Sequence, residues 1–189
     1  MYLQEPPRER QEIVNSHSAY KIRKRKRVWT AIQKGSGLVV DEQMVLSRGA
    51  NDDVIDIEVR TRGDKITRIV NVYDQKDAQS GDRERLARML NWERVIRQGS
   101  IVLEGDFNAH TKQWDTRCQV QQNTAFCEGV IDDKGQEIGN DSRPTHHWTR
   151  EEQQGESDID LMLGNRPLVK WTILADDHAT RSDHEVIEW

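Results

Sequence analysis

Apolar residues along the chain occur in short runs, and the clearest of these runs alternate with polar residues. Residues 55–59 alternate strictly between apolar and acidic side chains, which predicts a strand with one exposed face. A second run at 65–73 follows the turn residues 62–64, so the two strands are expected to pair as a hairpin. The Arg-Gly-Asp sequence is explained by that turn and does not indicate an adhesion motif.

Residues 82–98 give the clearest helix, with an apolar stripe, a capping Ser80 or Asp82 and a stop at Gly99. A second, short helix is expected around residues 135–139. Further strands are expected at 28–32, 37–46, 101–105, 145–149, 157–163, 170–174 and 185–189, with a charged loop at 150–155 between the fourth and fifth. Many strands, few helices and no regular alternation of the two favour a mixed α+β sandwich over a doubly wound sheet.

The composition is that of one globular domain with a small core. The chain has 189 residues, of which 34% are hydrophobic and 32% are charged, and this length predicts a single domain. The net charge of −5 argues against a generally basic nucleic-acid-binding protein. The basic cluster 21–27 is an exception, and it is either a phosphate-contacting or nuclear-localisation segment or simply a solvated face.

Cysteine usage and hydropathy predict the cellular compartment of the protein. Cys118 and Cys127 form neither a CxxC pair nor a disulfide framework, which favours a reducing compartment. No run approaches the roughly 18 apolar residues that a membrane helix needs, and residues 1–10 are too polar for a signal peptide. We therefore expect an intracellular protein, nuclear or cytoplasmic, that is neither secreted nor membrane-bound.

The stretch 101–110 is the first with candidate chemistry. An apolar run of strand length ends at Gly105, and Asp106 and Asn108 follow two residues apart, so both side chains leave the same face of an extended chain. A strand that ends in a carboxylate and a carboxamide is typical of an exposed active-site edge in α/β enzymes. Gly, Asp and Asn are also turn residues, and from these ten positions alone a turn and a site are equally good interpretations.

Four other polar clusters lie, like this one, at or next to the end of an expected strand. The five are Gln4-Glu5-Pro6, Asn71-Val72-Tyr73, Gly105-Asp106-Phe107-Asn108, Ser157-Asp158-Ile159-Asp160 and Ser182-Asp183-His184. Hydrolysis of a phosphodiester by water needs a positioned base, a cation on the non-bridging oxygens and help for the leaving oxygen. Scattered carboxylates also suit Mg²⁺, which binds few protein ligands and keeps water and substrate phosphate as the others. Each cluster alone is weak, because lone acids are usually solvated.

Taken in this order, the clusters resemble the endonuclease/exonuclease/phosphatase family. The match rests on LQEPP, RIVNVYDQ, IVLEGDFNAH with QW at 113–114, GNDSRPTHHW, SDIDLML and SDHEVIEW, and it covers essentially the whole chain. The sequence is most similar to the endonuclease domains of fungal non-LTR (LINE-type) retrotransposons. The resemblance implies a four-layer α/β sandwich of two mixed β-sheets flanked by helices, as in deoxyribonuclease I, over residues 1–189.

The resemblance also implies a Mg²⁺-dependent (or Mn²⁺-dependent) endonuclease that nicks DNA, as for target-primed reverse transcription. Glu5 is then the main metal-ligating carboxylate, and Asp183 lies near the metal as a ligand or through water. Asp106 orients or deprotonates the attacking water beside Asn108, which holds the phosphate. The remaining implied roles belong to Tyr73 (scissile phosphate), Asp160 (hydrogen bond to His184), His184 (charged imidazole on phosphate oxygens), Thr145 with 150–156 (DNA-facing rim), and Ser182 and Asn71 (substrate contacts).

Several neighbouring residues are better explained by structure than by chemistry. His146 and His147 are adjacent on an expected strand and point to opposite faces, which makes them poor co-ligands for a metal. Asp158 is expected to be a solvated neighbour of Asp160. The implied partners are DNA and a reverse transcriptase module of the parent element, and a monomer is expected.

One feature departs from the family pattern. The family's first strand, its asparagine and its first helix have no counterpart ahead of Glu5, so we expect the fold without its N-terminal strand and helix. This departure favours one alternative to the endonuclease, an inactive truncated relic or weak nucleic-acid-binding fragment. The acidic net charge favours another, a phosphoesterase of the same fold that acts on abasic DNA or a phosphomonoester.

Overall fold

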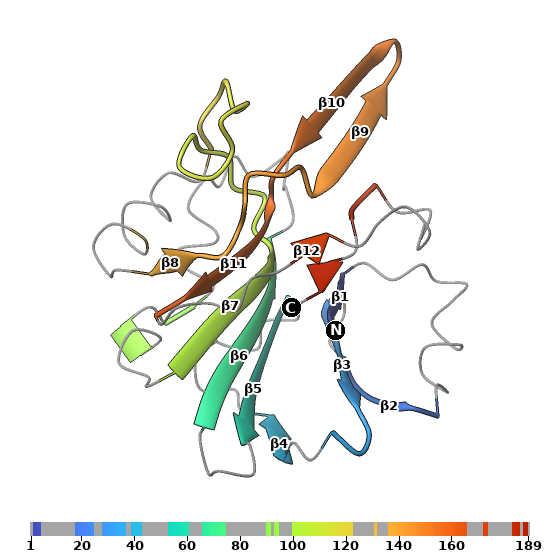
Figure 1. The fold of residues 1–189 in the computed structure, drawn as a ribbon, viewed down its shortest axis with the longest axis vertical. Coiled ribbons are helices and arrows are strands. Elements are labelled where there is room, and N and C mark those ends of the chain that lie inside the picture. The colour runs from blue at the N-terminus through green and yellow to red at the C-terminus, as the bar shows by residue number, and fades with distance from the viewer. Residues whose placement is uncertain are drawn as a thin grey trace.

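Two β-sheets packed face to face form the centre of the molecule (Figure 1). A computed structural model describes residues 2–4, 18–24, 28–36, 39–42, 53–60, 66–74, 90–91, 93–94, 100–122, 131, 136–165, 172–173, 183–185 and 187–188. The strands are β1 (Tyr2–Gln4), β2 (Tyr20–Lys24), β3 (Val28–Gln33), β4 (Val39–Glu42), β5 (Val54–Arg60), β6 (Ile66–Tyr73), β7 (Ser100–Asp106), β8 (Glu137–Ile138), β9 (His146–Arg150), β10 (Gln153–Ser157), β11 (Asp160–Gly164), β12 (Thr172–Ile173) and β13 (Ile187–Glu188).

The larger sheet has six strands in the order β4-β5-β6-β7-β11-β8. The predicted hairpin is confirmed, because β5 and β6 pair antiparallel along their whole length, with Ile57 opposite Ile69. Strands β6 and β7 pair parallel, which makes the sheet mixed and requires a crossover between them. The expected helix 82–98 falls on this crossover and lies mostly outside the described residues. Of its described positions, Glu93 and Arg94 are helical and Leu90 is fully buried in the core.

Each face of this sheet packs against a separate apolar cluster. One face carries Val70, Val72, Leu103, Leu161 and Leu163, which pack with other buried side chains such as Phe107 and Trp114. The other face carries Ile55, Ile57, Val59 and Tyr73, which pack on Val28 of the smaller sheet. A central sheet covered on both sides explains why the runs at 66–73 and 100–106 are buried at their carboxyl ends.

The smaller sheet is β1-β3-β2, with both pairs antiparallel. Asn71 of β6 ties the two sheets together, because its Nδ2 donates to the Trp29 carbonyl oxygen (3.1 Å) and to Thr30 Oγ1 (3.3 Å). Strand β2 was not expected, since three of its five residues are charged. It forms because it pairs with the buried strand β3, and the first part of the basic cluster 21–27 is therefore strand.

The segment 145–163 differs from the prediction of two strands joined by a long loop. Strand β10 begins at Gln153 and pairs with β9, so the turn is only Glu151 and Glu152. The chain then leaves the hairpin at Asp158 and Ile159 and enters the six-stranded sheet as β11. The single expected strand 157–163 is thus divided between two sheets. Figure 1 shows the β9–β10 hairpin projecting beyond the edge of the sheets.

Two further expectations concern residues 135–139 and the C-terminal strands. The short helix expected around residues 135–139 is wrong, because Glu137 and Ile138 form strand β8 at the edge of the large sheet, paired with β11. The two C-terminal strands are confirmed in shortened form as the β12–β13 pair. Within the described part of the chain, no helix has the length and hydrophobicity to span a membrane.

Candidate active site

Three of the predicted site residues lie side by side on adjacent strands of the large sheet. Tyr73 at the end of β6 is the register partner of Asp106 on β7, and Asp106 is the partner of Asp160 at the start of β11. Residues directly opposite each other across strands point to the same face. The three side chains therefore point to the same face of the large sheet, and all three are at least 90% buried.

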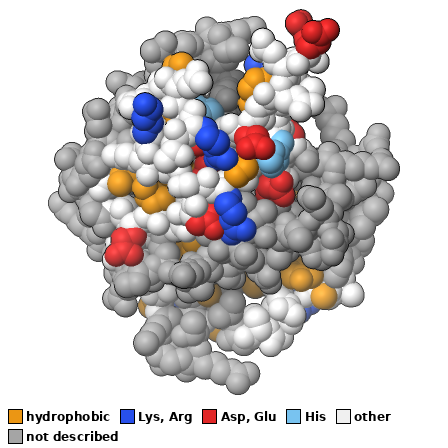
Figure 2. All heavy atoms as spheres, turned by 45° about the horizontal axis from the view of Figure 1, so that its top comes forward, with side chains coloured by type: hydrophobic (Ala, Val, Ile, Leu, Met, Phe, Trp, Pro, Cys, Tyr) orange, Lys and Arg blue, Asp and Glu red, His pale blue; other side chains and the backbone are white. Residues whose placement is uncertain are grey.

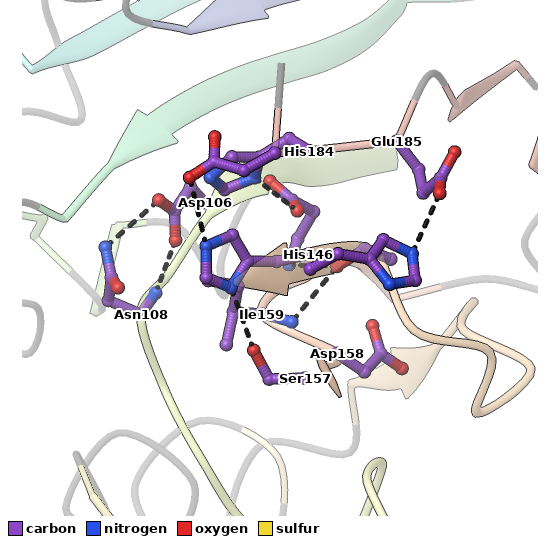
Figure 3. Close-up of polar contacts among 12 residues, drawn as sticks. Asp106, Asn108, His146, Ser157, Asp158, Ile159, His184 and Glu185 are labelled. Carbon is purple, nitrogen blue, oxygen red and sulfur yellow. Dashed lines mark hydrogen bonds and ion pairs between the residues drawn. The ribbon is translucent and has the colours of Figure 1, made fainter. Parts of the chain in front are cut away.

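The Gly105–Asn108 segment is both a turn and a group of aligned polar atoms (Figure 3). Asp106 Oδ1 accepts from the Asn108 backbone N–H (2.8 Å), and Asp106 Oδ2 accepts from Asn108 Nδ2 (3.0 Å). Asn108 Nδ2 also donates to the carbonyl oxygen of Asp74 (2.5 Å). Gly105 has φ 132° and Asn108 has φ 44°, conformations that glycine and asparagine adopt more easily than other residues. The turn geometry thus fixes the carboxylate in place.

His184 is bound to this row through Asp160. Its Nδ1 lies 2.8 Å from Asp160 Oδ2, the contact that the family resemblance implied. Burial disfavours the imidazolium, but the Asp160 hydrogen bond and the negative charges of Asp160, Asp106 and Asp183 outweigh it and raise the pKa of His184 to about 9. His184 is therefore a cation at neutral pH, held among three carboxylates.

Thr145 is inside the protein and not on the DNA-facing rim where it was expected. Its side chain has no exposed surface, and its Oγ1 accepts from the backbone N–H groups of Ile159 (3.1 Å) and Asp160 (3.0 Å). Ile159 lies where the chain passes from the hairpin to β11, and Asp160 is the first residue of β11. Thr145 thus positions the catalytic candidate Asp160 through its backbone.

The other predicted residues, and the side chain of Tyr73, differ in their surroundings. Asn71 is 1% exposed and its amide joins the two sheets, which contradicts the expected substrate contact. Asp183 is well exposed, and its place near a metal stays a prediction. Glu5 and Ser182 lie outside the described residues. Tyr73 is 8% exposed at the rim of the apolar cluster between the sheets.

Sequence reasoning missed His146 as a member of the site. As expected, His146 and His147 point apart: His147 Nε2 binds Glu185 Oε1 (2.8 Å), while His146 faces His184 with ring centroids 4.7 Å apart. Nε2 of His146 lies 3.4 Å from Asp183 Oδ2. A local signal existed, since an alternating strand that turns His147 outward turns His146 inward. Its partners 37 and 38 residues later could not be read from that strand.

The part of the chain that carries this geometry matches a known protein family. The model described as endonuclease-reverse transcriptase matches residues 67–188, well over half of the chain, and includes every described residue of the site. The chain belongs to the endonuclease-reverse transcriptase family. No curated protein matches the chain.

Solved structures agree with the fold of this endonuclease-reverse transcriptase chain. The endonuclease domain of TRAS1, a telomere-specific non-LTR retrotransposon, matches with a TM-score of 0.69 and 16% identity, over 90% of this chain and 79% of that chain. Truncated Caenorhabditis elegans TDP2 matches with a TM-score of 0.60 and 17% identity, over 98% of this chain and 81% of that chain. At these identities the likeness concerns the fold, and it confirms the predicted deoxyribonuclease I-like sandwich.

Asp158 is not the solvated side chain that was expected. Asp158 is fully buried, its Oδ1 accepts from Asn140 Nδ2 (2.6 Å), and its Oδ2 has no hydrogen-bond partner among the described residues. Burial, together with the charges of Asp115 and Asp160, outweighs the Asn140 hydrogen bond and raises the pKa of Asp158 to about 8. The protein therefore folds around a protonated Asp158 at neutral pH.

Asp158→Asn should stabilise the protein at neutral pH. Because the folded pKa of Asp158 lies above the unfolded value of 3.8, its contribution to stability is fully present below pH 4 and is lost as the pH rises towards 8. The neutral asparagine avoids this loss, so the free energy of unfolding at pH 7.5 should rise by up to about 5 kcal/mol. Urea unfolding between pH 4 and 8 measures the difference. Exposed Asp141→Asn is the control, and equal pH dependence in both variants would contradict the assignment.

Proposed function

We propose that this chain is a Mg²⁺-dependent endonuclease domain of retrotransposon origin that nicks DNA by hydrolysis of one phosphodiester bond. The observation that carries the proposal is the row of Tyr73, Asp106 and Asp160 on three adjacent strands, with His184 bound to its last member. It joins a carboxylate suited to activate water with an imidazolium suited to bind phosphate oxygens. A phosphoryl-transfer site needs both functions within reach of one phosphorus atom.

Asp106 is the base in this proposal. Two donors from Asn108 hold its carboxylate, so it presents a fixed acceptor to a water molecule at the sheet edge. Water attacks phosphorus, its proton passes to Asp106, and the bond from phosphorus to the leaving oxygen breaks. Asn108, in its strained conformation, lies where its amide can also approach the phosphate.

His184 binds the charge that develops on the phosphate. Its raised pKa keeps it protonated at neutral pH, and Asp160 fixes which ring nitrogen faces the protein. An imidazolium donates charge-assisted hydrogen bonds to the non-bridging oxygens and strengthens them as negative charge accumulates. Tyr73, at the rim of the same row, is the group proposed to contact the scissile phosphate.

The donor set supports a hard divalent cation. Three carboxylates, those of Asp106, Asp160 and Asp183, act electrostatically on the single imidazole of His184, which leaves excess negative charge at the site. Asp183 is far more accessible than Asp106 and Asp160, and it is the one proposed to hold Mg²⁺ together with Glu5. Bound Mg²⁺ supplies positive charge to phosphate oxygens and neutralises the leaving oxygen.

The β9–β10 hairpin is the surface we propose for contact with DNA. It projects from the sheet edge beside the site (Figure 1). The guanidinium of Arg150 lies 5.6 Å from the centroid of the Trp148 ring, and the ring rests on Gly155 of the opposite strand, where an added Cβ would collide with it. Figure 2 shows Asp, Glu and His side chains together on this side of the molecule, with Lys and Arg side chains among them.

Nicking of supercoiled plasmid tests the proposal. With Mg²⁺ the full chain is expected to convert supercoiled plasmid to the open circle, and EDTA should abolish the conversion, since the carboxylate-rich site needs a cation to accept phosphate. Added Mg²⁺ in excess of EDTA should restore it. Nicking that persists in EDTA, or hydrolysis of abasic DNA or a phosphomonoester without nicking of intact plasmid, would contradict the proposed reaction.

A further inference from the structure

His146, which sequence reasoning did not place in the site, forms a set of possible metal-binding atoms with Asp183 and His184. One donor atom each from His146, Asp183 and His184 lie within 4.8 Å of one another. In a tetrahedral site with bonds of about 2.0–2.1 Å, neighbouring donor atoms are about 3.4 Å apart. The His146 Nε2–Asp183 Oδ2 distance is already 3.4 Å. Asp183 has 64% of its side chain exposed, so it can adjust to the third donor.

The backbone holds the two histidines together. His146 and His184 form an antiparallel β-bridge. On either side of it, the His147 N–H donates to the Asp183 carbonyl oxygen (2.7 Å) and the Glu185 N–H donates to the Thr145 carbonyl oxygen (2.7 Å). The imidazoles are thus brought together by the fold itself and not by the chance approach of two surface side chains.

Each imidazole also has an oxygen partner on its Nδ1. His146 Nδ1 lies 3.1 Å from Ser157 Oγ, and His184 Nδ1 lies 2.8 Å from Asp160 Oδ2. Such outer partners fix the tautomer and orientation of metal-binding histidines, because the Nδ1–H bond to oxygen leaves Nε2 as the coordinating nitrogen (Figure 3). Both partners are buried, which limits the movement of the rings.

We propose that His146, Asp183 and His184 form a binding site for a transition metal ion, Zn²⁺ or a metal of similar preference. Two imidazoles and one carboxylate suit Zn²⁺, Co²⁺ or Ni²⁺ and not Mg²⁺, which prefers oxygen ligands. The ion displaces the proton of His184, since only neutral imidazole coordinates. Because it occupies Asp183 and His184, it blocks the proposed hydrolysis. The binding itself does not depend on that hydrolysis.

Co²⁺ titration of the full chain tests the site, because Co²⁺ bound by nitrogen and oxygen donors absorbs visible light and Mg²⁺ does not. The titration is carried out without Mg²⁺, because Asp183 is also the proposed Mg²⁺ ligand, and Zn²⁺ is then added to displace Co²⁺. We expect one Co²⁺ per chain and its displacement by Zn²⁺. His146→Phe should weaken binding at least tenfold, because even loss of an outer partner costs about 10–100-fold.

His147→Phe is the matched control, because it makes the same change at the neighbouring residue, which points away from the site. It should bind Co²⁺ like the unmodified chain. If His146→Phe does not fold, as judged by thermal melting, Ser157→Ala replaces it and should weaken binding by about tenfold. The inference is overturned if no Co²⁺ absorption appears, or if the folded test variant binds as tightly as the control. Since binding is read without DNA, a protein that binds Co²⁺ through His146 but fails to nick would refute only the proposed function.

Discussion

Asp106→Asn is expected to lower the rate of plasmid nicking by about 10²–10⁴-fold, the range that a general base contributes. The substitution keeps the size of the side chain but removes the negative charge that accepts a proton from water. It also replaces one acceptor of the Asn108 donors by an amide group. The measurement is the initial rate of nicking of supercoiled plasmid at saturating Mg²⁺.

The matched control for this loss is Asp141→Asn. Asp141 is an exposed acid whose ion pair with Arg143 lies on the surface, away from the row of site residues. It should nick at the unmodified rate, which separates a change at the site from a change in net charge. Thermal melts show whether Asp106→Asn is folded. Unchanged nicking by a folded Asp106→Asn variant would remove Asp106 from the mechanism.

The second large effect concerns pH. In the unmodified chain the active form of His184 is the cation, so the nicking rate should fall as the pH rises through about 9. Asp160→Asn removes the negative charge that raises this pKa while it keeps an oxygen near His184 Nδ1. The pKa of His184 should then move towards its ordinary value of 6.5, and the alkaline fall in rate should move to lower pH with it.

A pH series separates this effect from simple damage to the site. Between pH 5.5 and 6 the imidazole of the Asp160→Asn variant is largely charged again, so the difference in rate from the unmodified chain should shrink. At pH 8 the same difference should be much larger, about 10-fold or more once the pKa is lowered by about two units towards its ordinary value of 6.5. A rate ratio that stays constant across the series would mean that Asp160 acts on the structure alone.

The parts of the fold that followed from sequence are those in which one strand carries its own pattern. Residues 55–59 alternate because Ile55, Ile57 and Val59 face the apolar cluster between the sheets, so their pairing with β6 could be expected. The acidic face is not fully exposed as predicted, because Asp56 is buried and pairs with Arg68. Gly105 and Asn108 mark the end of β7 because their positive φ values favour glycine and asparagine. The meeting of Asp106 and Asp160 at one edge follows from where two strands end and begin.

Other parts depend on distant residues and could not be predicted. Strand β10 has no apolar alternation, because it pairs with β9 alone and has solvent on both faces. Asp158 resembles a surface acid in sequence. Its hydrogen-bond partners in the interior, Asn140 and Asp115, come from other segments of the chain. Thr145 and His146 likewise take their roles from Asp160 and His184, which no local pattern connects to them.

The way the chain passes from the hairpin to β11 has a consequence for engineering. Glu151 and Glu152 at the hairpin turn are exposed, and Glu151 has a positive φ of 55° that a glycine would adopt with less strain. Only Asp158 and Ile159 separate the hairpin from Asp160. Their backbone N–H groups donate to Asp115 Oδ2 and Thr145 Oγ1. For the proposed contact with DNA, new sequence is therefore best grafted between Arg150 and Gln153. A graft that extends down to Thr145 would also move Asp160 and, with it, the imidazole of His184.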